Sequence, residues 1–202
     1  MGGAKNCPET PRQKMIGMMY LVLTAMLALN VSAEVLQGYD MVFTSLKQSN
    51  TNADIRNTNY YENIEYLYSQ NPEKVGEWMQ KASLVKQKSD SLYNLIQEFK
   101  IGLVADAAGE AADPTGETIK KADNTSAGGR YAGLTEGEKR GENLKNAINE
   151  YRLYVEDLTG NDSLKNQVYD SRFSTADRYS EKAKQMVAWE SITFENMPAI
   201  AI

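Results

Sequence analysis

The stretch MIGMMYLVLTAMLAL, residues 15–29, decides how this chain is organised, because it contains no charged side chain. The uncharged run continues through Asn30 to Ala33 and ends before Glu34. At a helical rise of about 1.5 Å per residue, a helix over residues 15–33 is roughly 28 Å long, close to the hydrocarbon thickness of a bilayer. We therefore predict a transmembrane helix over residues 15–33.

The charges around this run predict its orientation. Lys5, Arg12 and Lys14 precede it, and an acidic residue follows it. The positive-inside rule then places residues 1–14 in the cytoplasm and residues 34–202 on the other side of the membrane. A cleaved signal peptide is the alternative, since the start is basic and small residues close the run. The chain retains the segment, which favours an anchor.

The composition of the 202 residues excludes several kinds of site. The chain has no histidine, which removes the most common general base and the most common metal ligand. Its one cysteine, Cys7, has no second cysteine to pair with, so neither an intrachain disulfide nor a thiolate zinc site can form. The net charge of −5 disfavours nucleic acid as a partner. We predict no catalytic, cofactor-binding or metal-binding residues, and no enzymatic activity.

The apolar side chains of the body follow helical spacing, which predicts an all-α fold. The clearest stripe predicts a helix over about residues 72–105, with Asn71 as its N-cap and Pro72 in its first turn. The stripe advances by alternating four- and three-residue steps and consists of Trp78, Ala82, Val85, Leu92, Ile96, Phe99 and Leu103.

Two further helices are predicted towards the C-terminus. One covers about residues 135–159, with Thr135 and Glu138 as a capping box. The other covers about residues 175–196 and ends before Pro198. The glycine-rich run from 107 to 133 is too long for a compact loop. It is expected to be mobile, or to fold locally around Ile119 and Tyr131.

The stretch that follows the apolar run also has helical spacing. A seam of apolar side chains is predicted to pack on the chain's own helices or on a second copy. It consists of Val35, Tyr39, Val42 and Leu46. One helix that continues from the membrane segment to about Gln70 is the favoured interpretation, since no proline interrupts residues 12–71. The alternative is a turn in the polar run 48–58, because asparagine-rich runs favour turns.

A few other residue groups could carry chemistry, and each has a simpler explanation. The acidic residues Asp113, Glu117 and Asp123 do not follow the spacing of a calcium loop, so a solvated acidic loop is favoured. Gly128-Gly129 lacks the strand and helix that surround a phosphate-binding loop, so a flexible turn is expected. The twelve tyrosines are interpreted as packing residues with hydrated hydroxyls.

Polar residues within the predicted membrane helix are candidates for contacts in the membrane. Tyr20 and Thr24 lie four residues apart on one helical face, which suits a partner helix, a second copy or the lipid interface. Asn30 is expected to form a hydrogen bond across helices or to face the outer headgroups. Arg12 precedes the run and, taken alone, serves as a determinant of topology.

The run PRQKMIGMMYLVLTAMLALNVSAEVL, residues 11–36, closely resembles the start of the GldM/PorM family. This family comprises the inner-membrane motor subunits of the type IX secretion and gliding machinery. Trp189, Phe194 and Pro198 are similar to the end of the first periplasmic domain of the family. Between these landmarks only the helical character is shared.

The resemblance implies a specific architecture and specific partners. Family members have one transmembrane helix and several periplasmic domains, of which the first is helical, and they work as homodimers. Two copies of the helix lie inside a pentameric ring of the polytopic partner GldL, and proton flow drives rotation that reaches the outer periplasmic components of the apparatus. The family pattern implies that Arg12 pairs with a GldL glutamate within the membrane and that Tyr20 faces the ring.

The resemblance also has limits. The segment from Cys7 to Glu9 and the glycine at position 17 depart from the family pattern. Because the family continues beyond Ile202, the chain is expected to be a truncated form that keeps the anchor and the first domain. The leading function is a force-transmitting subunit of a motor driven by the proton-motive force. The alternative is a signal-anchored periplasmic domain that senses or binds a ligand.

Overall fold

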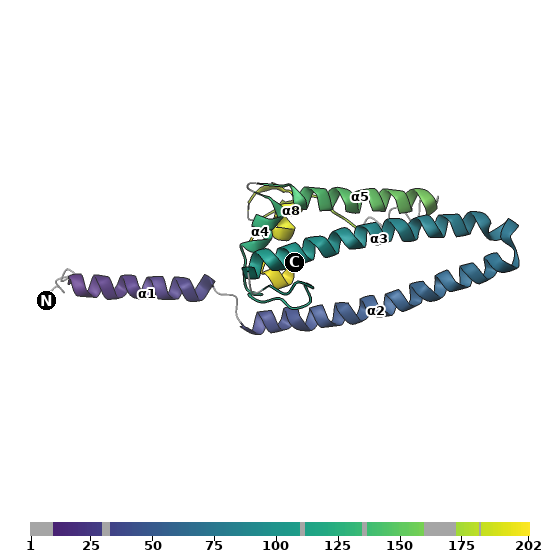
Figure 1. The fold of residues 1–202 in the computed structure, drawn as a ribbon. Helices are drawn as coiled ribbons and strands as arrows, with labels where there is room; N and C mark the ends of the chain where they lie inside the picture. The colour runs from purple at the N-terminus through teal and green to yellow at the C-terminus, as the bar shows by residue number, and fades with distance from the viewer. Residues whose placement is uncertain (1–9, 30–32, 110–111, 135–136, 160–172, 182) are drawn as a thin grey trace, which may run out of the picture.

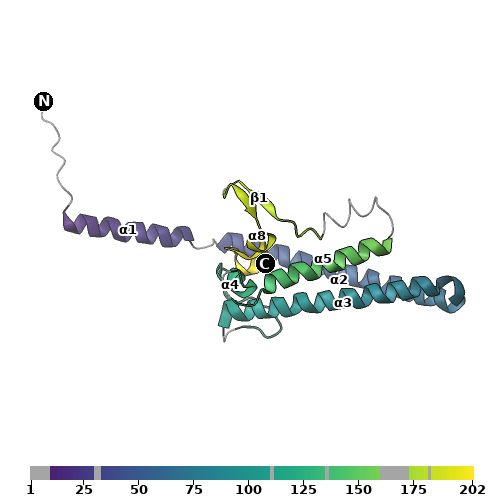
Figure 2. The ribbon, with the colours of Figure 1, turned by 90° about the horizontal axis from the view of Figure 1, so that it is seen from above.

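The computed structural model describes residues 10–29, 33–109, 112–134, 137–159, 173–181 and 183–202. The described part of the chain is mostly helical, as the sequence predicts, and it also contains one short β-hairpin. The helix α1, Pro11–Leu29, extends away from the rest of the molecule in both ribbon views (Figure 1, Figure 2). None of the helices in the described ranges is both long enough and apolar enough to cross a membrane.

The helix α2, Ala33–Gln70, runs without interruption through the polar run 48–58. A turn in that run, the alternative left open by the sequence, is therefore wrong. Thr51 donates its hydroxyl to the Lys47 carbonyl oxygen at 3.1 Å, one turn back along the same helix. Such bonds satisfy polar side chains within a helix instead of ending it. Whether α1 and α2 form one helix depends on residues 30–32, which lie outside the described ranges.

The helix α3, Pro72–Ala108, begins where the sequence predicts and ends three residues later than expected. The Asn71 side chain accepts a hydrogen bond from the Lys74 amide at 3.2 Å, so the predicted N-cap is confirmed. The helix α5, Arg140–Thr159, packs on α3, which also packs on α2, and in the view of Figure 1 α3 lies between the other two helices.

The predicted start of α5 is wrong. Its first residue is Arg140, and Glu138 lies before the helix in irregular backbone. Thr135, the other half of the expected capping box, lies outside the described residues. Gly133 and Gly137 have φ angles of 74° and 109°, which interrupt the helical backbone of this stretch.

The helix predicted over residues 175–196 is also wrong. This stretch forms the antiparallel hairpin of β1, Arg178–Ser180, and β2, Gln185–Val187, followed by the short helix α8, Trp189–Phe194. Lys184 adopts a φ of 54° in the turn, which helical backbone does not allow. The chain ends in the 3₁₀ turn η3, Ala199–Ala201.

The run from 107 to 133 folds locally and includes the helix α4, Ala127–Ala132. Ile119 and Tyr131 pack against the core there, as one of the two sequence interpretations predicts. The expected flexible turn at Gly128-Gly129 is instead part of α4. A Cβ atom on Gly128 would lie 2.5 Å from the Phe194 carbonyl oxygen, so this position requires glycine.

The buried core lies at one end of the bundle, which we call the base: the start of α2, the end of α3, α4, the start of α5 and the C-terminal segment. Its buried apolar residues form two adjoining clusters, which consist of Leu103, Ala107, Ala127 and Ala199, and of Ala132, Leu144 and Phe194. The helices α2 and α3 form a long helical hairpin, and no described residue from Glu34 to Gly102 is buried. We call residues 48–70 of α2 and 72–95 of α3 the distal half.

Candidate partner-binding surfaces

The apolar side chains of α1 are exposed on all sides of the helix. Exposed large apolar residues occupy most positions from 15 to 27, namely Met15, Ile16, Met18, Met19, Leu21, Val22, Leu23, Met26 and Leu27. A Cβ atom on Gly17 would have nothing within 4 Å. A helix that is apolar all round requires an apolar environment, which the rest of the described chain does not supply.

Three of the predicted membrane contacts lie on the described part of this helix, and they differ in whether their side chains have hydrogen-bond or ion-pair partners there. Arg12, in the first turn, has no ion-pair partner among the described residues. The Thr24 hydroxyl donates to the Tyr20 carbonyl oxygen at 2.8 Å and is also 3.1 Å from that of Leu21, so it needs no external partner. The Tyr20 hydroxyl, by contrast, has no hydrogen bond within the described part of the chain. Asn30 lies outside the described residues.

Most of the predicted seam on α2 is exposed within one chain. Val35, Val42 and Leu46 expose 49%, 55% and 59% of their surface, and Tyr39 is half-buried. The side of α2 that faces α3 is rotated by about one residue from the seam. Its half-buried members are Leu36, Phe43, Ala53, Tyr61 and Ile64. The seven-residue spacing of Leu36 and Phe43 is the signal that could have located this side from sequence.

Charged side chains join α2 to α3 at the base. Glu117, in the loop before α4, pairs with Lys47 of α2 and lies 3.8 Å from the Lys100 ammonium of α3. The hydrogen bond from Lys47 and the nearby Lys100 lower the pKa of the Glu117 carboxyl. The Lys100 ammonium also lies 5.8 Å from the centroid of the Phe43 ring. These contacts fix the loop and the start of α2 against the end of α3.

The loop itself is ordered by Asp113. Its carboxylate accepts hydrogen bonds from the amide and hydroxyl of Thr115, at 2.9 and 2.7 Å, and from the Thr118 amide at 3.0 Å. These donors lower the pKa of Asp113 to about 2. Asp113 therefore orders the backbone of this loop from Thr115 to Thr118.

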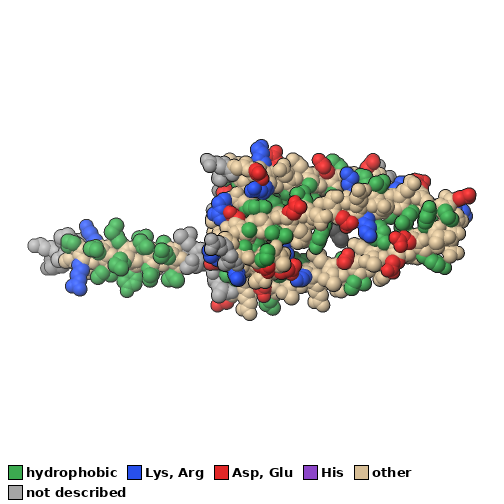
Figure 3. Space-filling model, viewed as in Figure 1, with side chains coloured by type: hydrophobic (Ala, Val, Ile, Leu, Met, Phe, Trp, Pro, Cys, Tyr) green, Lys and Arg blue, Asp and Glu red, His purple; other side chains and the backbone are tan. Residues whose placement is uncertain are grey.

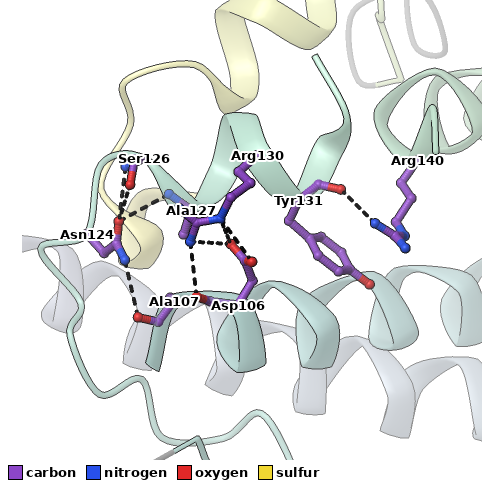
Figure 4. Close-up of polar contacts among 8 residues, drawn as sticks. All are labelled: Asp106, Ala107, Asn124, Ser126, Ala127, Arg130, Tyr131 and Arg140. Carbon is purple, nitrogen blue, oxygen red and sulfur yellow. Dashed lines mark hydrogen bonds and ion pairs between the residues drawn. The ribbon is translucent and has the colours of Figure 1, made fainter. Parts of the chain in front are cut away.

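A second group of polar contacts holds α4 against the end of α3 (Figure 4). The side-chain nitrogen of Asn124 donates to the Ala107 carbonyl oxygen at 3.2 Å. Its side-chain oxygen accepts a hydrogen bond from the backbone amide of Ala127 at 3.1 Å. The Arg130 guanidinium forms an ion pair of 2.7 Å with Asp106, and this raises the pKa of Arg130. Both contacts link residues of the glycine-rich run to α3.

A third group holds the β-hairpin against α5. The Lys145 ammonium lies 2.9 Å from Asp177 and 3.3 Å from Glu190. Asp177 also accepts a hydrogen bond from the Trp189 amide at 3.0 Å, at the start of α8. The hydrogen bond from Lys145 and that from the Trp189 amide lower the pKa of Asp177. Phe194, at the end of α8, is thereby placed in the core.

Residues 34–202 match a family model described as the GldM N-terminal domain. The chain belongs to the GldM family. No curated protein matches it. The GldM family takes part in gliding motility and type IX secretion, is associated with membranes and with GldL, and has structural or motor roles rather than those of a classical enzyme.

The match confirms the resemblance stated from sequence, and it does so on a different part of the chain. The resemblance depends mainly on residues 11–36, whereas the GldM match covers the helical body. Two of the C-terminal landmarks are residues of the base: Phe194 is buried, and its ring lies 5.6 Å from that of Trp189. The GldM domain described here is therefore closed by its own C-terminal segment.

Proposed function

We propose that this chain is a non-enzymatic, force-transmitting subunit of a rotary motor driven by the proton-motive force, which powers type IX secretion and gliding. The observation that carries the proposal is α1, a helix with apolar side chains on all sides that is joined to a GldM body. Such a helix suits the interior of a ring of membrane helices.

In this proposal residues 15–33 cross the inner membrane, residues 1–14 lie in the cytoplasm and residues 34–202 lie in the periplasm. The proposed span includes positions 30–32, which the structure does not describe. The three basic residues before the span and the acidic residue after it support this orientation. The body then begins at the outer membrane–water interface, and its base is the end nearest the membrane.

Arg12 is the proposed contact with a GldL-like ring. An arginine at the edge of an apolar helix is costly unless it meets a carboxylate, and Arg12 has no such partner within the described chain. Tyr20, Thr24 and Asn30 are the other proposed contacts within the membrane. Because residues 15–33 contain no acid and no histidine, the proton carrier belongs to the ring partner.

The exposed seam on α2 supports a homodimer. Two copies inside a pentameric ring would bring the two seams together directly above the paired membrane helices. Val42 and Leu46 are more than half exposed within one chain, and burial against a second copy would remove this apolar surface from water. The dimer would carry the motion of the ring to the outer periplasmic components of the secretion apparatus.

The test is the substitution Arg12→Ala, with Lys14→Ala as the matched control, because both variants remove one positive charge before the span. Arg12→Ala is expected to abolish secretion and gliding at normal protein level, and Lys14→Ala to retain them. Arg12→Lys should restore function only in part, since an ammonium cannot form the bidentate contact of a guanidinium. Equal function of Arg12→Ala and wild type would refute the assignment.

Assembly is tested separately by the mass of the complex extracted in detergent after co-expression with the GldL-like partner. Two copies of this chain with five of the partner are expected. A stable chain that never copurifies with the partner, in wild-type form, would contradict the motor proposal and favour a sensory or ligand-binding role.

A further inference from the structure

The distal half contains a groove between α2 and α3 of about 670 Å³. Figure 3 shows the molecule hollowed between these two helices. The groove spans residues 54–65 of α2, which corresponds to roughly 17 Å or three helical turns. The apolar part of its lining consists of Ile64, Ala82 and Val85. None of its lining residues is buried.

The charges around this groove are strongly unequal. Four carboxylates line it, Asp54, Glu62, Glu65 and Asp90, against a single ammonium, that of Lys86. The aromatic lining consists of Tyr60, Tyr61 and Tyr151. Carboxylates and the faces of aromatic rings both attract cations.

One cation already lies beside an aromatic ring of the groove. The Lys86 ammonium lies 5.2 Å from the centroid of the Tyr61 ring. The Tyr61 hydroxyl donates to the Ala82 carbonyl oxygen at 3.3 Å, which holds the ring between the two helices. Burial, followed by the nearby Tyr151 and Asp90, raises the pKa of the Tyr61 hydroxyl. The aromatic lining therefore already has the ammonium of one lysine against it.

We infer that this groove binds a basic amphipathic helix of a partner protein, whose lysine or arginine side chains meet the carboxylates while its apolar side packs on Ile64, Ala82 and Val85. The inference is independent of the proposed membrane span and motor role. Long basic side chains suit the groove because their stems cover apolar surface while their charges reach its rim. A groove between two helices is a common receptor for a third.

Charge disfavours a second copy of this chain as the occupant. A two-fold interface places the same surface of both copies face to face. At a two-fold interface through the groove, the four carboxylates and one ammonium of one copy would face the same five charges of the other copy. The exposed seam on α2 and the groove are therefore assigned to different partners.

The experiment measures binding of a dye-labelled, fourteen-residue helical peptide of leucine, alanine and lysine to the full chain in detergent, by fluorescence anisotropy. A peptide with glutamate in place of lysine is the negative probe. Only the lysine peptide is expected to bind, and binding should weaken as salt rises from about 0.05 M to about 0.3 M. Failure of the wild-type chain to bind the lysine peptide, or equal binding of both peptides, would overturn the inference.

Two variants of equal charge locate the binding site. Glu62→Gln/Glu65→Gln/Asp90→Asn neutralises the groove, and Asp40→Asn/Glu73→Gln/Glu98→Gln neutralises exposed acids of the same two helices outside it. The groove variant should weaken binding by about tenfold or more, and the control by about twofold or less. An equal loss in both variants would show unspecific attraction to an acidic protein and would overturn the site.

Two further outcomes also overturn it. If free spermidine displaces the peptide at equal concentration, the groove is a site for small polyamines. If the groove variant, and not the control, changes the sedimentation of the chain alone, the groove holds a second copy. The motor proposal stands or fails on Arg12 and on the complex with the ring, so the two sets of results are distinguishable.

Discussion

The base and the distal half of the bundle are built by different kinds of contact. At the base, segments far apart in sequence meet: the Phe194 ring lies 5.1 Å from that of Phe99, and Leu103 packs with Ala199. In the distal half the same two helices α2 and α3 continue side by side, and no described residue there is buried. Long apolar stripes therefore do not ensure a closed core.

The difference follows from what covers each part of α3. At the base α3 is covered by α4, α5 and the C-terminal segment. Towards the other end, among the described residues, it is flanked by α2 and α5, and a groove remains. We therefore assign folding stability mainly to the base, and binding of partners to the distal half and the exposed seam.

The largest expected effect is loss of a buried aromatic residue at the base. Phe194→Ala should lower the free energy of unfolding by about 3–5 kcal/mol, since Phe194 is 2% exposed and its removal leaves a cavity. Trp78→Ala, at a residue of the distal half that is 61% exposed, should cost about 0.5 kcal/mol or less. Denaturant unfolding of the full chain in detergent measures both values. Similar losses of unfolding free energy in the two variants would contradict the assignment of stability mainly to the base.

The next effect concerns close packing of backbone. Gly128→Ala should cost about 1–3 kcal/mol, because the new Cβ atom would lie 2.5 Å from the Phe194 carbonyl oxygen. Gly38→Ala is the matched control on α2, where a Cβ atom would have nothing within 4 Å. Alanine there should leave stability unchanged or raise it by up to about 1 kcal/mol. Thermal unfolding followed by circular dichroism measures both variants.

These contrasts also explain which features could be predicted from sequence. Local signals succeeded where local contacts decide: Asn71 caps α3, and Pro72 is its first residue. They failed for residues 175–196, because the spacing of Ala183, Met186 and Val187 fits a helix as well as it fits the observed hairpin. The segment that leads into the hairpin contacts Lys145, more than thirty positions earlier in the chain, and local patterns contain no such information.

The candidate surfaces were predictable to a different extent. The apolar character of α1 could be predicted from the uncharged run 15–33, and the family could be recognised from residues 11–36. The side of α2 that meets α3 is hard to distinguish from the seam beside it, because Leu36 and Val35 lie on overlapping stripes, and the seven-residue spacing of Leu36 and Phe43 is the signal that marks it. The groove required the structure, since its carboxylates come from two helices that only the fold brings together.

A smaller effect is expected from the ion pairs that hold the hairpin. Lys145→Met should lower stability by about 1 kcal/mol, because the half-buried ammonium bonds both Asp177 and Glu190. Lys184→Met is the control, since the Lys184–Glu181 pair of 3.2 Å is fully at the surface and should contribute little. If both variants unfold at the same denaturant concentration as wild type, the hairpin is held by packing alone.

The same ion pairs predict a pH dependence. The pKa of Asp177 is lowered in the folded chain, so its contribution is present above about pH 4 and is lost as the pH falls through the folded value. The pKa of Lys145 is raised, so its contribution is present below about pH 10 and is lost as the pH rises through the folded value. Stability of the wild type, relative to Lys145→Met, should therefore be greatest between these limits.

The smallest effect tests whether the loop at the base is ordered by its own hydrogen bonds. The Asp113 carboxyl should titrate at about 2 in carbon-13 NMR, well below the ordinary aspartate value of about 3.9, because the Thr115 hydroxyl and two backbone amides donate to the ionised form. With a lowered pKa, the contribution of Asp113 to loop order is complete above about pH 4 and is lost as the pH falls through about 2.

Thr115→Val removes only the hydroxyl, the largest cause of the lowered pKa, so the midpoint should rise without reaching the ordinary value. Thr118→Val should raise it less, since its side chain is the smallest cause. A wild-type midpoint near the ordinary value of about 3.9, or an equal rise in the two variants, would contradict ordering of the loop by the Asp113 hydrogen bonds and leave the Glu117 ion pairs with Lys47 and Lys100 as the contacts that hold it.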